Sequence, residues 1–117
     1  MAQVISATKP GDPAAGDEIF IKCSGCHQAG PGSVNGIGPQ LNGVVGRLSG
    51  SVAGYDYSPA LASAKITWSH DALAAFVTDP RHLVPGTKMS FAGLKNAQDV
   101  EDLIAYLSQF DADGRTR

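Results

Sequence analysis

Both cysteines of this 117-residue chain lie in one short motif, Cys23-Ser24-Gly25-Cys26-His27. The spacing Cys-x-x-Cys-His is typical of covalent haem attachment, because two thiols can form thioether bonds with the two vinyl groups of a haem. The imidazole that follows the second thiol is then held where its nitrogen can bind the iron. The motif therefore predicts a covalent haem, its attachment through Cys23 and Cys26, and a first axial ligand in His27.

Two other kinds of site use a Cys-x-x-Cys pair. A thioredoxin-like redox dithiol normally follows a strand in an alternating βαβ pattern, and the sequence has no such alternation. A structural zinc site needs four ligands, and the chain adds only His70 and His82 to the three residues of the motif. Their spacing does not match a zinc finger, although a zinc site that takes a distant ligand stays open.

Length and composition favour one globular domain with a modest core. Hydrophobic residues make up 43% of the chain and charged residues 17%, which is the balance of a folded protein rather than a disordered one. No apolar run approaches the ~18 residues that indicate a membrane span, so we expect none. Residues 1–10 hold one lysine and no apolar segment of the signal-peptide type, so we expect no signal peptide in the chain as given.

The formal net charge of −2 is unevenly distributed along the chain. Acidic residues exceed basic ones over residues 1–19 and from residue 96 onward, whereas residues 20–95 hold six basic and three acidic side chains. Two acidic helices with solvated surface charge would give this pattern. A basic docking face on an acidic body would give it too, and both interpretations stay open.

The first helical segment has a clear start and an unusual glycine. Asp12 can cap free backbone amides and Pro13 suits the first helical position, so we predict a helix from here to Phe20. Gly16 lies inside this helix, where glycine costs about 1 kcal/mol relative to alanine. Its presence suggests that another backbone approaches closely here. We expect this to be the backbone of the last helix.

Three more helices are predicted, and no segment carries a convincing strand signal. The last helix follows the cap Asn96, and its apolar residues recur at the i, i+3, i+4, i+7 spacing of one buried face: Val100, Leu103, Ile104 and Leu107. Another helix begins at Ser69 and ends at Asp79, because the next residue is proline. A short helix is expected from Ser58 to Ala64.

The connection over residues 27–54 contains eight glycines, too many for a regular helix or strand. A structureless loop of this length usually argues against a compact domain. It becomes reasonable when a large rigid cofactor fills the space that the loop surrounds. The glycines therefore support the haem interpretation independently of the cysteines.

Met89 is the only internal methionine, and it ends the segment Pro85-Gly86-Thr87-Lys88-Met89 after the predicted third helix. A single methionine is more often a core residue than a ligand. An extended loop shaped by proline and glycine is a poor place for a core residue, and from it a thioether can reach a metal. Ligation by His27 and Met89 would keep the iron six-coordinate and low-spin, so it would transfer electrons without opening a substrate site.

Taken in order, these motifs resemble the class I cytochromes c, of the small mitochondrial type and its bacterial respiratory and photosynthetic relatives. The resemblance covers residues 11–110 and rests on eight motifs: Cys23 to His27, Gly38-Pro39, Gly43 to Arg47, Gly54 to Tyr57, Ile66 to Trp68, Pro85 to Met89, Phe91 to Gly93 and Asp102 to Leu107. It implies an all-α single-domain fold, with about four helices and glycine-rich loops wrapped around one covalent haem. A flexible extension over residues 1–10 and a tail over residues 111–117 would flank this domain.

The resemblance also implies roles for individual residues. Pro39 would present its carbonyl to the second nitrogen of His27, which fixes the ring and strengthens its donation to iron. Three side chains would donate hydrogen bonds to the buried haem propionates: Arg47, Tyr57 and Trp68. Thr87 would add another donor near the methionine, and Phe91 would pack at the haem rim.

Two residues depart from the mitochondrial pattern. Phe76 stands where that type has a tyrosine whose hydroxyl reaches the methionine sulfur, and Leu61 stands where it has an asparagine. We expect a drier methionine side of the haem. Loss of the hydroxyl lowers the reduction potential and loss of polar groups near the iron raises it, so the net direction stays open.

The basic residues of the middle segment are implied to surround the exposed haem edge: Lys22, Arg81, Lys88 and Lys95. They would steer an acidic partner into fast, transient contact. Because they are fewer than in the mitochondrial type, we expect a weaker dependence on salt. We expect His70 and His82 to be surface residues without a role.

The function implied by the resemblance is one-electron transfer rather than enzymatic catalysis. The chain would shuttle electrons from a membrane quinol-oxidising complex to an oxidase, a photosynthetic reaction centre or another periplasmic redox enzyme. It would be a monomer in the bacterial periplasm, or alternatively in the mitochondrial intermembrane space, without a nucleic-acid partner. A haem enzyme or gas sensor with an open iron position is the alternative, and ligation by Met89 separates the two.

Overall fold

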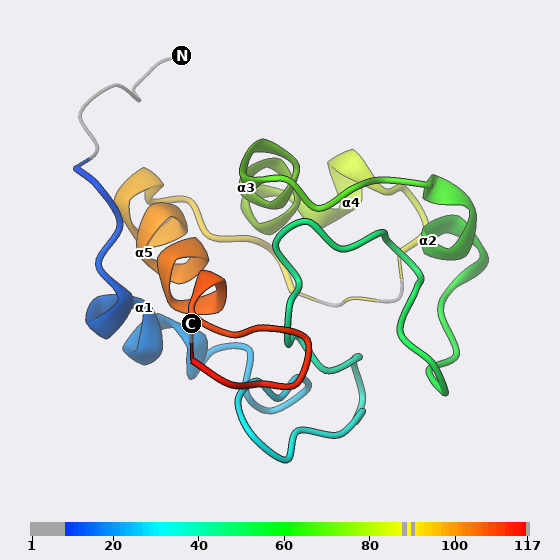
Figure 1. Cartoon of the computed structure of the whole chain (residues 1–117). Helices are drawn as coiled ribbons and strands as arrows, with labels where there is room; N and C mark the ends of the chain where they lie inside the picture. The colour runs from blue at the N-terminus through cyan, green and yellow to red at the C-terminus, as the bar shows by residue number, and fades with distance from the viewer. Residues whose placement is uncertain (1–8, 88, 90, 117) are drawn as a thin grey trace.

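Two helices from opposite ends of the chain pack side by side and form the base of the fold (Figure 1). The computed structural model describes residues 9–87, 89 and 91–116. In it, α1 (Pro13–Phe20) lies against α5 (Ala97–Ser108). Between them, the described residues form α2 (Pro59–Ala64), α3 (His70–Thr78) and α4 (Pro80–Leu83). The described residues form no strand, only two isolated bridges, so the all-α prediction is confirmed.

The four predicted helices begin where the sequence places their caps. In each, a side chain accepts a hydrogen bond of 3.0 to 3.2 Å from a backbone N–H in the first turn: Asp12, Ser58, Ser69 and Asn96. One such cap contributes about 1 kcal/mol. The sequence did not predict α4, because a helix of one turn shows no apolar periodicity. Pro80 ends α3 as expected and also begins this extra turn.

Gly16 allows the close approach of α1 to α5, as predicted. It is buried, and a Cβ atom at this position would overlap the backbone carbonyl of Asp102. The same Cβ would lie 2.7 Å from the Cβ of Tyr106. The predicted apolar face of α5 is buried against this contact and the core: Val100, Leu103, Ile104 and Leu107.

A buried carboxylate also joins these two helices, and its burial was not predicted. Asp102 is 7% exposed. Its Oδ1 accepts hydrogen bonds of 2.9 Å from the backbone N–H of Asp12 and from Nε2 of Gln98. The carboxylate therefore binds the start of α1, which lies 90 residues earlier in the chain.

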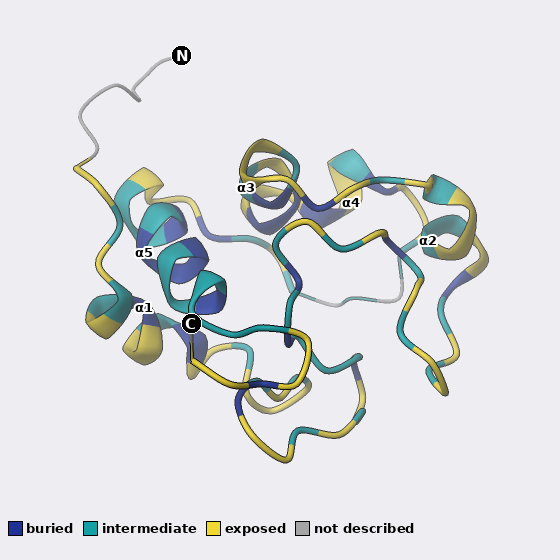
Figure 2. Ribbon diagram, viewed as in Figure 1, coloured by how far each residue is buried: buried dark blue, intermediate teal, exposed yellow. Residues whose placement is uncertain are grey.

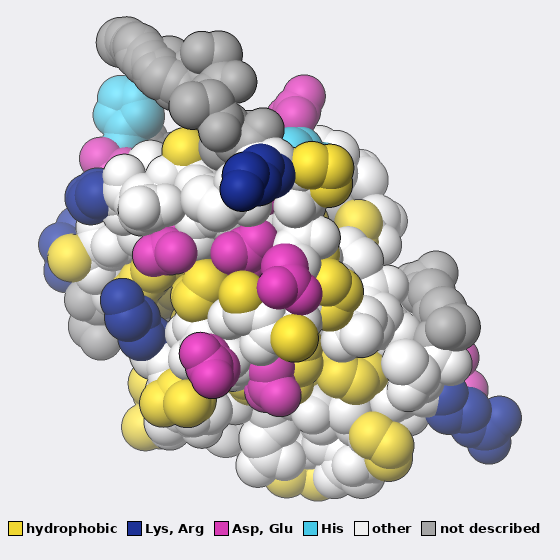
Figure 3. Space-filling model, turned by 90° about the vertical axis from the view of Figure 1, so that its left-hand side faces the viewer, with side chains coloured by type: hydrophobic (Ala, Val, Ile, Leu, Met, Phe, Trp, Pro, Cys, Tyr) yellow, Lys and Arg dark blue, Asp and Glu magenta, His cyan; other side chains and the backbone are white. Residues whose placement is uncertain are grey.

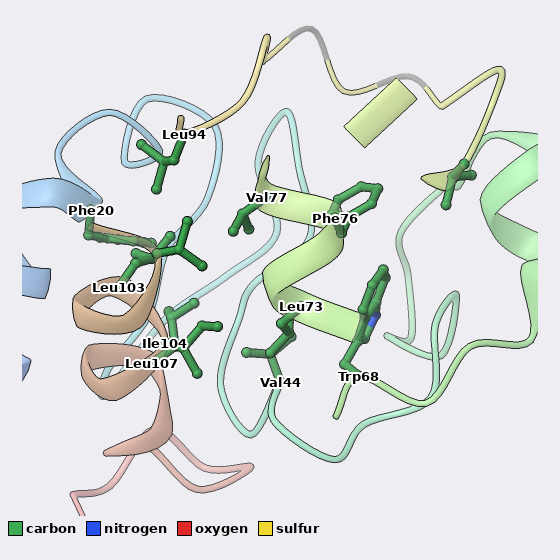
Figure 4. Close-up of a cluster of buried hydrophobic side chains, with 12 residues drawn as sticks. Phe20, Val44, Trp68, Leu73, Phe76, Val77, Leu94, Leu103, Ile104 and Leu107 are labelled. Atoms are coloured by element: carbon green, nitrogen blue, oxygen red, sulfur yellow. The ribbon is translucent and has the colours of Figure 1, made fainter. Parts of the chain in front are cut away.

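The core lies between α5 and α3 (Figure 4). Figure 2 shows that the inner sides of these helices are buried, while their outer sides are exposed. Among the described residues, twelve apolar side chains form this cluster: Phe20, Val44, Trp68, Leu73, Phe76, Val77, Val84, Leu94, Val100, Leu103, Ile104 and Leu107. Within the part of the chain that the structure describes, none of the helices has the length and apolarity needed to cross a bilayer.

The two ends of the chain differ in how much the structure describes. Of the expected extension over residues 1–10, only residues 9 and 10 lie within the described part, and the backbone N–H of Lys9 donates to Oε1 of Gln98 at 2.7 Å. At the other end, residues 111–116 fold back in a turn, closed by a bridge between Phe110 and Thr116. This C-terminal turn packs against the glycine-rich loop, residues 27–54.

Candidate functional site

A cavity of about 310 Å³ lies between the helices and the glycine-rich loop, within the size range of small-molecule sites. Its lining includes all ten predicted ligand and haem-binding residues: Cys23, Cys26, His27, Pro39, Arg47, Tyr57, Trp68, Thr87, Met89 and Phe91. Eight residues of the apolar core line it too: Phe20, Val44, Trp68, Leu73, Phe76, Val77, Leu103 and Leu107. The fold thus brings residues from six separate segments to one largely apolar space.

The two cysteines reach this cavity from a turn that directly follows α1. The backbone N–H groups of Cys26 and His27 donate to the carbonyl of Cys23 at 3.0 and 2.9 Å. Both thiols are free, with Cys23 half-buried and Cys26 exposed. Burial raises the pKa of the Cys23 thiol, the neighbouring Cys26 raises it further, and Lys22 opposes them.

His27 is held in the form that binds a metal. Its Nδ1 lies 2.7 Å from the carbonyl oxygen of Pro39. A carbonyl only accepts, so Nδ1 carries the proton and Nε2 of the neutral ring keeps a lone pair. Burial lowers the pKa of this imidazole and Arg47 lowers it further, while the bond to Pro39 opposes them. The ring is therefore neutral near pH 7, as a metal ligand must be.

Gly38 provides the space for this ring. A Cβ atom at position 38 would lie 2.7 Å from Nδ1 and 2.8 Å from Nε2 of His27. The backbone N–H of Gly38 also donates to the carbonyl of Cys26 at 2.8 Å. The loop after the motif is thus fastened to the motif itself, and only glycine fits beside the imidazole.

Met89 reaches the same cavity from the segment after α4. Its backbone N–H donates to Oγ1 of Thr87 at 3.3 Å, so this hydroxyl acts on the methionine backbone. An imidazole nitrogen, a thioether and two thiols around one apolar cavity fit a covalent haem with two axial ligands. Zinc is a poorer match, because the described residues include no group of three or more His, Cys, Asp or Glu side chains that could hold a metal ion.

Two of the predicted propionate donors make hydrogen bonds to the backbone. Nη1 of Arg47 donates to the carbonyls of Gln40 at 3.0 Å and Asn42 at 3.1 Å, so a propionate would draw on the other guanidinium nitrogen atoms. The hydroxyl oxygen of Tyr57 accepts from the N–H of Val52 at 3.0 Å, which leaves its own O–H as a donor. Their role toward propionates stays a prediction.

The two departures from the mitochondrial pattern both line the cavity. Phe76 is 8% exposed, and its ring centroid lies 5.0 Å from that of Trp68. Leu61 contributes a second apolar side chain from α2. These positions therefore present hydrocarbon where the mitochondrial type presents polar groups.

Tyr55 is an aromatic residue of the cavity for which the sequence predicted no individual role. Tyr55 lines the cavity, and its hydroxyl donates to the carbonyl of Ile37 at 2.6 Å. Its ring contacts Tyr57 with centroids 4.7 Å apart. The motif Gly54 to Tyr57 marked this segment as part of the resemblance, but only the folded loop shows that Tyr55 supports the cavity wall.

The structure shows three of the four predicted docking residues, and Lys88 lies outside the described part. Lys22, Arg81 and Lys95 are exposed, and Lys22 also lines the cavity. Nζ of Lys95 donates to the carbonyl of Thr78 at 2.6 Å. Acidic side chains gather instead on the face formed by α1 and α5 (Figure 3).

His70 makes contacts that the sequence did not indicate. Its Nδ1 lies 2.9 Å from Oδ1 of Asp71 and its Nε2 lies 2.9 Å from Oε1 of Glu101, so it links α3 to α5 at the surface. The hydrogen bonds with Asp71 and then Glu101 raise the pKa of the imidazole, against a small opposing effect of burial. His82 is exposed, as expected.

The chain is similar to known proteins over most of its length. A family model for cytochrome c matches residues 13–111. Cytochrome c2 of Rhodoblastus acidophilus is 49% identical over 104 residues, which cover 89% of this chain and 97% of that protein. Cytochrome c-550 of Nitrobacter winogradskyi is 47% identical over 107 residues, covering 92% and 98% of the two chains.

Among solved structures, cytochrome cH from Methylobacterium extorquens superimposes with a TM-score of 0.79 at 43% sequence identity, covering 85% of this chain and 99% of that chain. The likeness therefore extends over nearly the whole length of the relatives and includes both fold and sequence. The chain belongs to the class I cytochrome c family, whose members are electron-transfer proteins with a covalently bound haem c.

Proposed function

We propose that this chain is a periplasmic one-electron carrier in which His27 and Met89 are the two axial ligands of haem c. The observation that carries this proposal is the 2.7 Å bond between Nδ1 of His27 and the Pro39 carbonyl, in the cavity that Met89 also lines. This bond leaves Nε2 as the coordinating atom. Once both cysteine thiols are used for attachment, the thioether of Met89 is the soft donor that remains among the predicted ligands.

The residues of the chain serve electron transfer by keeping the ligands and surroundings of the haem the same in both oxidation states. When bound, haem c supplies the one-electron ferric/ferrous couple. The Pro39 carbonyl fixes the ring of His27, and the apolar walls keep water and small ligands away from the iron position. One electron enters from a reduced donor and one leaves to an oxidised acceptor, without a bond forming or breaking in the protein.

Replacing the methionine tests the ligand assignment. The parent ferric protein should show the methionine-to-iron charge-transfer band, and the reduced protein should not bind carbon monoxide. Met89→Ala should lose the band and bind carbon monoxide. A pyridine haemochrome spectrum of both proteins checks the two thioether bonds. A parent protein with high-spin iron that binds carbon monoxide would instead favour a haem enzyme or gas sensor.

The proposed partners are a membrane quinol-oxidising complex as donor and an oxidase, reaction centre or other redox enzyme as acceptor. The bacterial relatives named cytochrome c2 and cytochrome c-550 support the periplasm over mitochondria. Lys22 is exposed where it lines the cavity, so Lys22→Glu should slow reduction by an acidic partner more than the equal charge change Lys9→Glu. A reduction rate that does not depend on ionic strength would exclude steering by this face.

A further inference from the structure

The bond between His27 and Pro39 is the inner connection of a small ladder that closes the loop between these residues. The next connection joins the backbone N–H of Leu41 to the carbonyl of Gln28 at 2.9 Å. The outer connection, one step further from the cavity, is made by a side chain rather than by the backbone. The position of the Pro39 carbonyl therefore depends on how firmly the outer end is closed.

Asn42 closes the outer end. Its Oδ1 accepts from the backbone N–H of Gly30 at 2.7 Å, and its Nδ2 donates to the carbonyl of the same residue at 3.0 Å. Both bonds are buried, and Asn42 is 5% exposed. The side-chain amide thus takes the place of a paired peptide group, and its loss would leave a buried N–H unsatisfied.

Arg47 strengthens the same end of the ladder from the other side. Its Nη1 donates to the backbone carbonyls of Gln40 and Asn42 at 3.0 and 3.1 Å. These residues flank Leu41, and Gln40 immediately follows Pro39. The segment that carries the proline carbonyl is therefore bound at successive positions along its length.

The C-terminal turn, residues 111–116, covers this outer connection. Gly114 is buried with φ +82°, and a Cβ atom there would lie 2.6 Å from Nδ2 of Asn42 and against the backbone of Gly30. The backbone N–H of Gly43 donates to the carbonyl of Phe110 at 3.2 Å and joins the loop to the start of the turn. Because the turn excludes water, the hydrogen bonds between the Asn42 side chain and Gly30 are protected from competition by solvent.

We propose that Asn42, covered by the C-terminal turn, is a positioning residue that holds the Pro39 carbonyl on Nδ1 of His27. This inference rests on the proposed function, in which His27 is an axial ligand. A hydrogen bond to Nδ1 strengthens the donation of the imidazole to iron and so favours the ferric state. Opening the ladder weakens that bond, and the reduction potential rises.

The experiment compares holoprotein carrying Asn42→Ala with the parent. Two quantities are measured: the reduction potential, and the hydrogen-exchange rate of the Nδ1 proton of His27 by NMR in the reduced protein. We expect a higher potential and faster exchange, with unchanged exchange of the amides in α5. The control is Asn96→Ala, which removes the cap of α5 and lowers stability but should change neither quantity.

Equal potential and exchange in Asn42→Ala and the parent would overturn the proposal, and so would equal changes in Asn96→Ala. If Asn42→Ala yields no folded holoprotein, the same two quantities are measured in Gly114→Ala, because its new Cβ displaces the turn from Asn42. An unchanged potential in that variant also overturns the proposal. Failure of the ligand assignment is separate, because it would show in the ferric spectrum of the parent.

Discussion

The contact between α1 and α5 makes a quantitative prediction at Gly16. In Gly16→Ala, the new Cβ would overlap the backbone carbonyl of Asp102 and lie 2.7 Å from the Cβ of Tyr106, whereas ordinary contacts begin at 3.4 Å. The carbonyl belongs to a helix and cannot rotate away, so the helices must separate. Overpacking of this kind costs about 1–3 kcal/mol of stability. Because the obstacle here is backbone, we expect a cost near the upper value. Alanine recovers about 1 kcal/mol of helix propensity.

The net expectation is a loss of about 2 kcal/mol in the free energy of unfolding. Denaturant unfolding of the holoprotein, followed by circular dichroism of the helices, measures it. The matched control is Gly25→Ala, where the added Cβ meets nothing within 4 Å and the change should stay within about 0.5 kcal/mol. A Gly16→Ala protein as stable as the parent would refute the reasoning, since helix propensity would then outweigh the contact.

Three further variants test the site and the helix packing. Gly38→Ala places a Cβ 2.7 Å from Nδ1 of His27, so we expect a high-spin fraction in the ferric spectrum, and a fully low-spin spectrum would contradict this. The raised pKa of His70 means that its stabilising contribution is complete below the unfolded pKa of about 6.5 and is lost as the pH rises through the higher folded pKa. Unfolding of His70→Ala and the parent should therefore differ by about 0.2–1 kcal/mol at pH 5.5 and converge in alkaline buffer. Phe76→Tyr brings a hydroxyl to the cavity and should lower the pH at which Met89 leaves ferric iron, and an unchanged transition in a pH titration would show that position 76 does not tune the ligand.

The sequence was sufficient wherever a local rule decides the structure. Asp12 and Asn96 could be identified as caps because a cap acts within its own first turn. Gly16 indicated close helix packing because glycine inside a helix otherwise has no benefit. The ligand-bearing motif and Met89 could be found because covalent attachment fixes the spacing of the first and the chain offers few soft donors for the second.

Residues whose roles depend on distant partners could not be found this way. The burial of Asp102 depends on a backbone N–H that lies 90 residues away. Asn42 looks like any polar loop residue until the loop closes and its amide meets Gly30. Arg47 could be placed near the site by resemblance, but its bonds to two loop carbonyls follow from the conformation of that loop.

Eight of the twelve core side chains are also walls of the cavity, which affects the chain before it carries haem. Without the cofactor these walls have nothing to pack against, and a domain of this size has little stability to lose. We expect the haem-free chain to be largely unfolded, with its thiols accessible until both thioethers form. Proteases that degrade unfolded chains would then remove protein that has missed attachment, so the population that remains would be the population able to carry electrons.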